Sequence, residues 1–168
     1  SDPPGQLVVR PATVQDAGEI ARIYNRHVDA GGATFDTEHW STGQVVAMLS
    51  DGAPRDGWYL ALFGDRVAGW AAARRYSARF GYRFTCESAI YLDPPMIGRG
   101  VADPLQRRIE RHCREQDIHH AVARIVTHNS RSIAFHQRYG YECVGVQKEI
   151  GHMDGDWVDV TIMQKLFA

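Results

Sequence analysis

The chain has 168 residues, of which 44% are hydrophobic, which is enough for one domain with a substantial core and too little for two. Its 19 Lys and Arg residues against 20 Asp and Glu give a formal net charge of −1, so charge offers no support for binding nucleic acid or an anionic membrane. Its cysteines and histidines lack the spacing of a disulfide framework or a metal site, and no apolar stretch reaches the roughly 18 residues of a membrane span. We therefore expect a cytoplasmic protein without a metal. Its expected partner is a small molecule or another protein.

The elements expected along the chain alternate between strands and helices. Residues 1–6 have the composition of a flexible tail, and the domain covers residues 7–168. The expected strands are 7–10, 58–63, 67–73, 85–92, 121–126, 141–150 and 157–167, and the expected helices run from Thr13 to Gly31, from Ser41 to Asp51, from Gly100 to about Gln116, and over 130–139. Hairpins at both ends and one strand-helix-strand crossover predict a single α/β domain. Its sheet is mixed and mostly antiparallel, with about seven strands and a parallel pair at the crossover, and about four helices cover it.

A glycine-rich turn over 93–102 lies between an expected strand and an expected helix. Glycines let backbone N–H groups approach an anion, and a helix N-terminus adds partial positive charge, so a phosphate site is one interpretation and a simple turn is the other. A P-loop would end in Gly-Lys-Ser/Thr, whereas this loop ends in Val101-Ala102-Asp103. A dinucleotide fold would place the loop near the start of a parallel βαβ series, and here it follows antiparallel hairpins.

Several motifs in order along the chain resemble those of the phosphinothricin and methionine sulfoximine acetyltransferases of the GNAT superfamily. They are 97–102, which is similar to the acetyl-CoA pyrophosphate loop Gln/Arg-x-x-Gly-x-Gly/Ala, and 9–16, 23–25, 33–35, 82–87, 129–132, 135–141, 151, 157, 159 and 163–164. The resemblance covers roughly residues 7–167. Ile97 departs from the loop pattern, which usually has a polar residue there.

The resemblance implies a sheet that splays between strands 85–92 and 121–126, with acetyl-CoA as co-substrate in the opening. The residues it assigns to the co-substrate are Ile90, Tyr91 and Leu92 for the pantetheine arm, Gly98, Arg99, Gly100, Val101, Ala102 and Asp103 for the pyrophosphate, and Asn129 and Ser132 at the next helix. Asn129 would bind the pantetheine amide or, in the alternative, only cap that helix. A carboxylate beside a pyrophosphate is unfavourable, so we expect Asp103 to turn away and cap its own helix.

Glu87 and His136 are the candidate catalytic residues. An ionised carboxylate in the middle of an apolar strand requires a partner or a task, and the resemblance implies that Glu87 is the general base; the alternative is a carboxylate paired with Arg83 or Arg79. His136 lies where the resemblance implies a proton donor to the CoA sulfur, and the alternative is a histidine that packs beside Phe135 and Tyr139. A backbone N–H near Leu92 is the expected donor to the thioester oxygen.

For the acceptor, the resemblance assigns Arg79 and Tyr82 to the anionic group and Phe35 to a pocket wall. A guanidinium suits a carboxylate or phosphinate through bidentate hydrogen bonds. The resemblance therefore implies direct transfer of acetyl from acetyl-CoA to the α-amine of a phosphinothricin, methionine sulfoximine or methionine sulfone type of acceptor, and it implies a homodimer. The alternatives are a protein or peptide N-acetyltransferase and a non-catalytic CoA-binding module.

Overall fold

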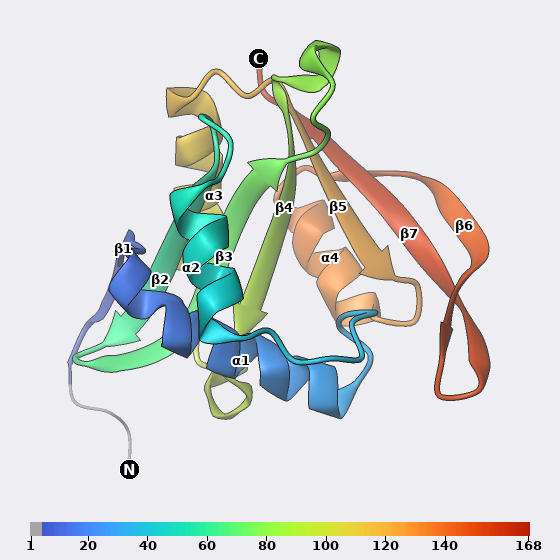
Figure 1. Cartoon of the computed structure of the whole chain (residues 1–168). Helices are drawn as coiled ribbons and strands as arrows, with labels where there is room; N and C mark the ends of the chain where they lie inside the picture. The colour runs from blue at the N-terminus through green and yellow to red at the C-terminus, as the bar shows by residue number, and fades with distance from the viewer. Residues whose placement is uncertain (1–4) are drawn as a thin grey trace.

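A mixed sheet of seven strands runs through the molecule in the order β1-β2-β3-β4-β5-β7-β6 (Figure 1). The structure is a computed structural model that describes residues 5–168, so residues 1–4 of the expected tail lie outside the described residues. The strands are β1 (Leu7–Pro11), β2 (Gly57–Phe63), β3 (Arg66–Arg75), β4 (Thr85–Leu92), β5 (His120–Val126), β6 (Glu142–Met153) and β7 (Asp156–Leu166). The helices are α1 (Ala17–Ala30), α2 (Thr42–Ser50), α3 (Ala102–Glu115) and α4 (Ser130–Arg138), with short 3-10 turns η1 (Val14–Asp16), η2 (Phe80–Tyr82) and η3 (Pro94–Met96).

The strand directions confirm the predicted sheet. Every neighbouring pair is antiparallel except β4 and β5, which are parallel and are joined through α3. A parallel pair needs a crossover, and α3 supplies it. The fold class predicted from the order of the elements is therefore confirmed.

Local sequence signals explain where the helices begin. Ser41 accepts a hydrogen bond from the Gln44 N–H at 3.1 Å, and the Gln44 side chain accepts one from the Ser41 N–H at 2.7 Å, which is a complete capping box. Thr13 and Asp16 form the other predicted box, but it opens the 3-10 turn η1, so α1 begins at Ala17, later than predicted. Gly31 ends α1 with φ 74°, a conformation that favours glycine.

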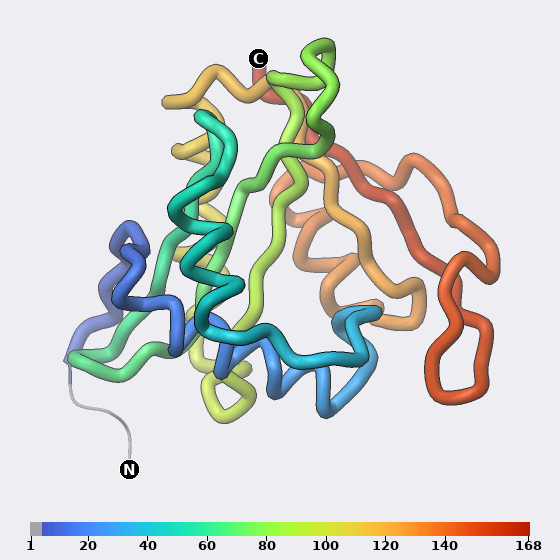
Figure 2. The backbone as a smooth tube through the Cα atoms, in the orientation of Figure 1, coloured from blue at the N-terminus to red at the C-terminus, as the bar shows by residue number. Residues whose placement is uncertain are grey.

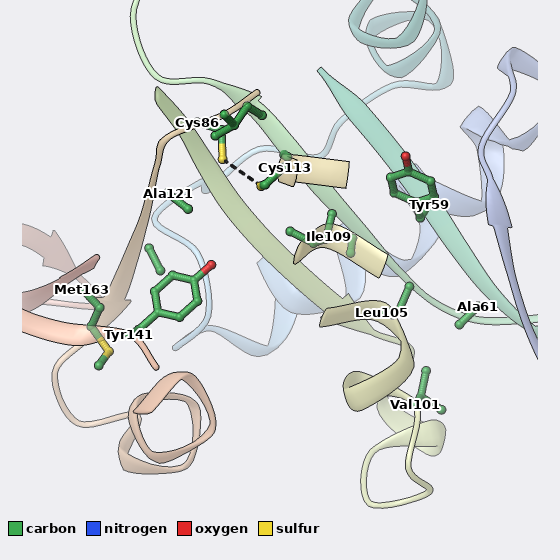
Figure 3. Close-up of a cluster of buried hydrophobic side chains, with 14 of the residues drawn as sticks. Tyr59, Ala61, Cys86, Val101, Leu105, Ile109, Cys113, Ala121, Tyr141 and Met163 are labelled. Atoms are coloured by element: carbon green, nitrogen blue, oxygen red, sulfur yellow. Dashed lines mark hydrogen bonds between the residues drawn. The ribbon is translucent and has the colours of Figure 1, made fainter. Parts of the chain in front are cut away.

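Two hydrophobic cores lie on opposite faces of the sheet, because successive strand residues point to opposite sides. On one face α1 and α2 pack against residues such as Leu60, Trp70 and Ala72. On the other face α3 packs against Tyr59 and Ala61, and Figure 3 shows this cluster continuing toward β5 and β7. The helices of the two faces hold the central strands, and with them the end of β4, in a fixed position.

The hairpin of β6 and β7 extends beyond the rest of the sheet (Figure 2). Its pairing shifts register between Gln147 and Gly151, where Glu149 has φ 54° and its N–H donates to Asp159 at 2.7 Å. Beyond this bulge, Gly151 lies against Phe35 of the loop that follows α1. Among residues 5–168, no helix is long and apolar enough to cross a membrane.

Candidate active site

The strands β4 and β5 separate soon after they pair. Their parallel ladder joins only Thr85–Glu87 to residues 120–122, while β4 stays paired with β3 as far as Leu92. The edge of β4 over 88–92 that faces β5 is therefore not paired with that strand. Ile90, Tyr91 and Leu92 lie in this opening, which is the place that the sequence predicts for the pantetheine arm.

The glycine loop lies at the end of the same strand. Gly98 and Gly100 have φ of 83° and 76°, so both need the conformation that glycine adopts without strain. Of the atoms in residues 5–168, none lies within 4 Å of the position that a Cβ on Gly100 would take, and only the Arg131 side chain reaches 4.0 Å at Gly98. Val101 is buried and precedes the first turn of α3. This open backbone at a helix N-terminus fits a pyrophosphate group.

Asp103 is turned away from the glycine loop, but it does not cap α3 as expected. Its Oδ1 accepts a hydrogen bond from the Tyr139 hydroxyl at 2.6 Å and one from Arg138 Nη2 at 3.3 Å, whereas the start of α3 has no side-chain cap. The carboxylate thus joins the first turn of α3 to the end of α4. The expectation of a helix cap is wrong because partners on α4 are within reach, which the sequence does not reveal.

Glu87 lies on β4 at the point where the two strands begin to separate. Its Oε2 accepts a hydrogen bond from Arg124 Nη2 at 2.8 Å, and its side chain keeps 37% of its surface exposed. The partner is thus a residue of β5, and neither Arg83 nor Arg79, which the alternative named, pairs with it among residues 5–168. Among residues 5–168, Oε1 makes no hydrogen bond or ion pair, so it can accept a further hydrogen bond.

His136 is buried in α4 and has a defined tautomer. Its Nδ1 lies 2.7 Å from the Ser132 carbonyl oxygen, which can only accept, so Nδ1 carries the proton. Burial lowers the pKa of His136 and favours the neutral ring. In this form Nε2 carries no proton, so His136 can donate from Nε2 only after it has taken a proton up.

Asn129 has the helix-capping contact that the alternative predicted. Its Oδ1 accepts a hydrogen bond from the Ser132 N–H at 3.3 Å at the start of α4. The side-chain amide nitrogen is not used in that contact and remains available as a donor. Ser132 also joins Asn129 to His136, because its carbonyl is the acceptor for the histidine ring.

The three predicted acceptor residues lie in separate places. Phe35 packs on the backbone of Gly151, where a Cβ would come within 2.5 Å of the ring. The Tyr82 ring contacts Tyr76, with centroids 5.4 Å apart. Arg79 lines a cleft of about 210 Å³ at the start of β4, together with Thr85 and Cys86. Within residues 5–168, no hydrogen bond or ion pair joins these side chains to Glu87.

Two residues of this region were missed by the sequence analysis. Arg124 is the ion-pair partner of Glu87, and the only signal for it was a charged residue inside the apolar strand 121–126. Tyr141 is buried beneath β4 (Figure 3), where its hydroxyl lies 2.9 Å from Ser88 Oγ and 3.5 Å from Gln106 Nε2. Burial raises the pKa of Tyr141, so the hydroxyl stays protonated.

A second cleft lies away from all of these residues. It measures about 530 Å³ and runs along the end of β2 between α2 and α3. None of the predicted site residues lines it. Glu87 and residues 90–92 thus lie at the opening between β4 and β5 and not at this cleft.

Comparison with known proteins connects this geometry to one family. The family model of the acetyltransferase (GNAT) domain matches residues 9–162. A phosphinothricin N-acetyltransferase from Alcaligenes faecalis is 32% identical, with 94% of this chain and 81% of that protein covered. An L-methionine sulfoximine/L-methionine sulfone acetyltransferase from Pseudomonas paraeruginosa is 31% identical, with 93% of this chain and 92% of that protein covered. The crystal structure of a phosphinothricin acetyltransferase from Sinorhizobium meliloti, in complex with acetyl-CoA, superposes with a TM-score of 0.91 at 29% identity, with 96% of this chain and 89% of that one covered.

Proposed function

The chain belongs to the GNAT acetyltransferase family and is an acetyl-CoA-dependent N-acetyltransferase, and we propose that its acceptor is the α-amine of a small amino-acid analogue of the phosphinothricin, methionine sulfoximine or methionine sulfone type. Relatives named for these acceptors cover nearly the whole chain. The observation that carries the proposal is the position of Glu87, a half-exposed carboxylate where β4 and β5 separate, on the strand that ends at the glycine loop.

Acetyl-CoA supplies an activated acetyl thioester. In our proposal Gly98 and Gly100 admit its pyrophosphate to the backbone at the start of α3, together with residues 99 and 101–103. The backbone of Ile90, Tyr91 and Leu92 then lines the pantetheine arm along the unpaired edge of β4. Asn129 donates to a pantetheine amide through its free side-chain nitrogen while its oxygen caps α4.

Glu87 is the general base in this proposal. Its unoccupied Oε1 accepts a proton from the acceptor's ammonium group, directly or through a water. An α-amine titrates near pH 8 and is already about a tenth neutral at pH 7, so this step supplies only about 10²-fold of the rate. Positioning of the two substrates supplies the larger part. His136 is the proposed donor to the CoA sulfur, after Nε2 has taken up a proton.

The acceptor's far end is held by Arg79, Tyr82 and Phe35 in this proposal. Arg79 has no ion-pair partner among residues 5–168, and Tyr82 and Phe35 are both partly exposed. A free guanidinium and two aromatic rings suit a small acceptor with a polar or anionic side chain. Their positions on loops allow them to close on the acceptor once it binds.

The test of the proposal is a Glu87→Gln variant assayed with acetyl-CoA and methionine sulfone over a range of pH. We expect kcat/KM to fall about 10²-fold near pH 7 and the loss to shrink above pH about 8, where the amine deprotonates by itself. Glu142→Gln is the control, because this carboxylate is exposed on β6 and, within the described part of the chain, its one hydrogen-bond partner is Gln164. An unchanged kcat/KM across pH removes Glu87 from the base role, and turnover of peptides alone supports a peptide N-acetyltransferase instead.

We also propose that the enzyme is a cytoplasmic homodimer. Support comes from apolar side chains on β6 and β7, of which Val144, Ile150 and Trp157 are each more than half exposed. Exposed apolar side chains gathered on one hairpin are typical of a surface that another protein covers. Light scattering on the purified protein should give twice the chain mass, and a monomer at micromolar concentration would contradict the proposal.

A further inference from the structure

We propose that Arg124 is a specificity-determining residue that binds the α-carboxylate of the acceptor while Glu87 receives its α-amine. The inference rests on the proposed function and makes it more specific, because it assigns the recognition of an amino acid, as distinct from a simple amine, to one side chain. It starts from the ion pair at the opening between β4 and β5.

The sheet places Arg124 beside Glu87 on one face. Glu87 is opposite Val122 in the parallel register, and Arg124 follows two residues later on β5. Side chains two residues apart in a strand share a face, so Arg124 projects to the same side as Glu87. The Arg124 side chain thus lies where β4 and β5 separate, which is the opening that acetyl-CoA occupies in the proposed function. The result is the 2.8 Å contact between Arg124 Nη2 and Glu87 Oε2.

Arg124 retains donors for a second anion. A guanidinium has five N–H groups in a rigid fork, and one hydrogen bond from Arg124 is used on Glu87. The side chain is 51% exposed, and Glu87 is its one ion-pair partner among residues 5–168. Since the other N–H groups of this guanidinium make no second hydrogen bond within residues 5–168, they can bind a carboxylate in a bidentate manner.

The structure of an α-amino acid requires its two ionic groups to be recognised side by side. The amine nitrogen and the carboxylate carbon are both bonded to Cα, so they lie about 2.5 Å apart. Residues that bind them must be neighbours, as Arg124 and Glu87 are. Arg79 lines the cleft at the start of β4, and among residues 5–168 no hydrogen bond or ion pair joins it to Glu87. Arg124 and Arg79 thus have different tasks.

A neighbouring arginine on this face, Arg74, supplies a matched control. Arg74 is opposite Glu87 in the antiparallel register of β3 and β4, so it shares the face. Its guanidinium lies over the Trp58 ring, 5.3 Å from the centroid, and it has no hydrogen bond or ion pair to Glu87 within the described part of the chain. Replacement of Arg74 removes a positive charge from the same face without removing the proposed carboxylate ligand.

The experiment compares two acceptors, methionine sulfone and its decarboxylated amine, which differ only in the carboxylate. Both are assayed with the wild type and with the Arg124→Gln, Arg124→Lys and Arg74→Gln variants. For Arg124→Gln we expect kcat/KM with methionine sulfone to fall about 10- to 100-fold, mainly through KM, and to change less than about 3-fold with the amine. Arg124→Lys keeps the positive charge but loses the forked guanidinium, so its kcat/KM with methionine sulfone should lie between the values of wild type and Arg124→Gln. For Arg74→Gln, kcat/KM with each acceptor should stay within about 2-fold of the wild-type value.

Equal losses on both acceptors would overturn the inference, because Arg124 would then act only through Glu87. If the wild type acetylates amino acids but Arg124→Gln and Arg124→Lys do not alter the preference for the carboxylate, the inference fails and the proposed function stands. If the wild type acetylates no amino acid, both fail. Should Arg124→Gln not fold, as judged by circular dichroism, the change of KM in Arg124→Lys decides between these outcomes.

Discussion

Replacing Asp93 with asparagine tests how the end of β4 is held in place. Asp93 follows β4 directly, and its side chain is only 3% exposed. Oδ1 accepts a hydrogen bond from Arg26 Nη1 at 2.7 Å and Oδ2 one from Arg22 Nη1 at 3.3 Å, so the carboxylate joins α1 to the start of the loop that contains Gly98. An asparagine keeps the shape but presents an N–H₂ donor to one of the two guanidinium groups.

The magnitude follows from the burial of the three side chains. Removal of one partner from a fully buried ion pair costs about 3–5 kcal/mol, and a hydrogen bond to a charged group contributes about 1.5–3 kcal/mol. Arg22 and Arg26 are each about half exposed, so water can solvate their guanidinium groups once the carboxylate is gone. The range for a hydrogen bond to a charged group therefore applies, and the larger range for a fully buried ion pair does not. We expect the free energy of unfolding to fall by about 2 kcal/mol, which for a chain of this size lowers Tm by about 4–8 °C.

Chemical denaturation and kinetics measure the two parts of this prediction. Asp29→Asn is the control, because Asp29 pairs with His39 at 2.7 Å on the surface and should change stability by less than about 0.5 kcal/mol. Asp93→Asn should also raise the KM for acetyl-CoA, since the loop begins at that residue, and leave the acceptor KM unchanged. A stability loss no larger than that of Asp29→Asn would refute the reasoning that the buried Asp93 carboxylate, through its ion pairs with Arg22 and Arg26, anchors the loop.

Two further predictions concern Gly151 and His136. Gly151→Ala places a methyl group 2.5 Å from the Phe35 ring, so the ring must move; we expect a several-fold higher acceptor KM with an unchanged acetyl-CoA KM, whereas Gly145→Ala on the same strand meets no atom within 4 Å and should change neither. Burial lowers the pKa of His136 in the folded state from 6.5, so the unfolded chain binds more protons and stability should fall as the pH drops below about 6.5. The free energy of unfolding, measured from denaturation curves between pH 5 and 8, should fall less steeply with decreasing pH for His136→Gln than for wild type. An identical pH dependence of the two proteins would contradict a buried neutral ring.

Local signals made most of the fold predictable. The capping box at Ser41, the glycines after α1 and the two hairpins each depend on residues a few positions apart, and each was found where predicted. The start of α1 was placed too early, since the box at Thr13 opens a 3-10 turn first. Such an error is expected because the two kinds of helix share the same start signals.

The partners of the site residues could not be predicted in the same way. Arg124 is 37 residues from Glu87 in sequence, and only the register of β4 and β5 brings them together. The direction of Asp103 depends likewise on where α4 ends. Glu87 could be proposed as a candidate without knowledge of its partner, because a carboxylate inside an apolar strand is unusual and because the family resemblance implies a general base at that position.

The most direct test of the account is to identify the product. Purified protein is incubated with acetyl-CoA and L-methionine sulfone or phosphinothricin, the released CoA thiol is measured, and the acceptor is analysed by mass spectrometry and NMR. The account predicts one α-N-acetylated acceptor for each thiol released, with both substrates required together. Binding of acetyl-CoA without transfer to any of these amines, at millimolar acceptor, would contradict it.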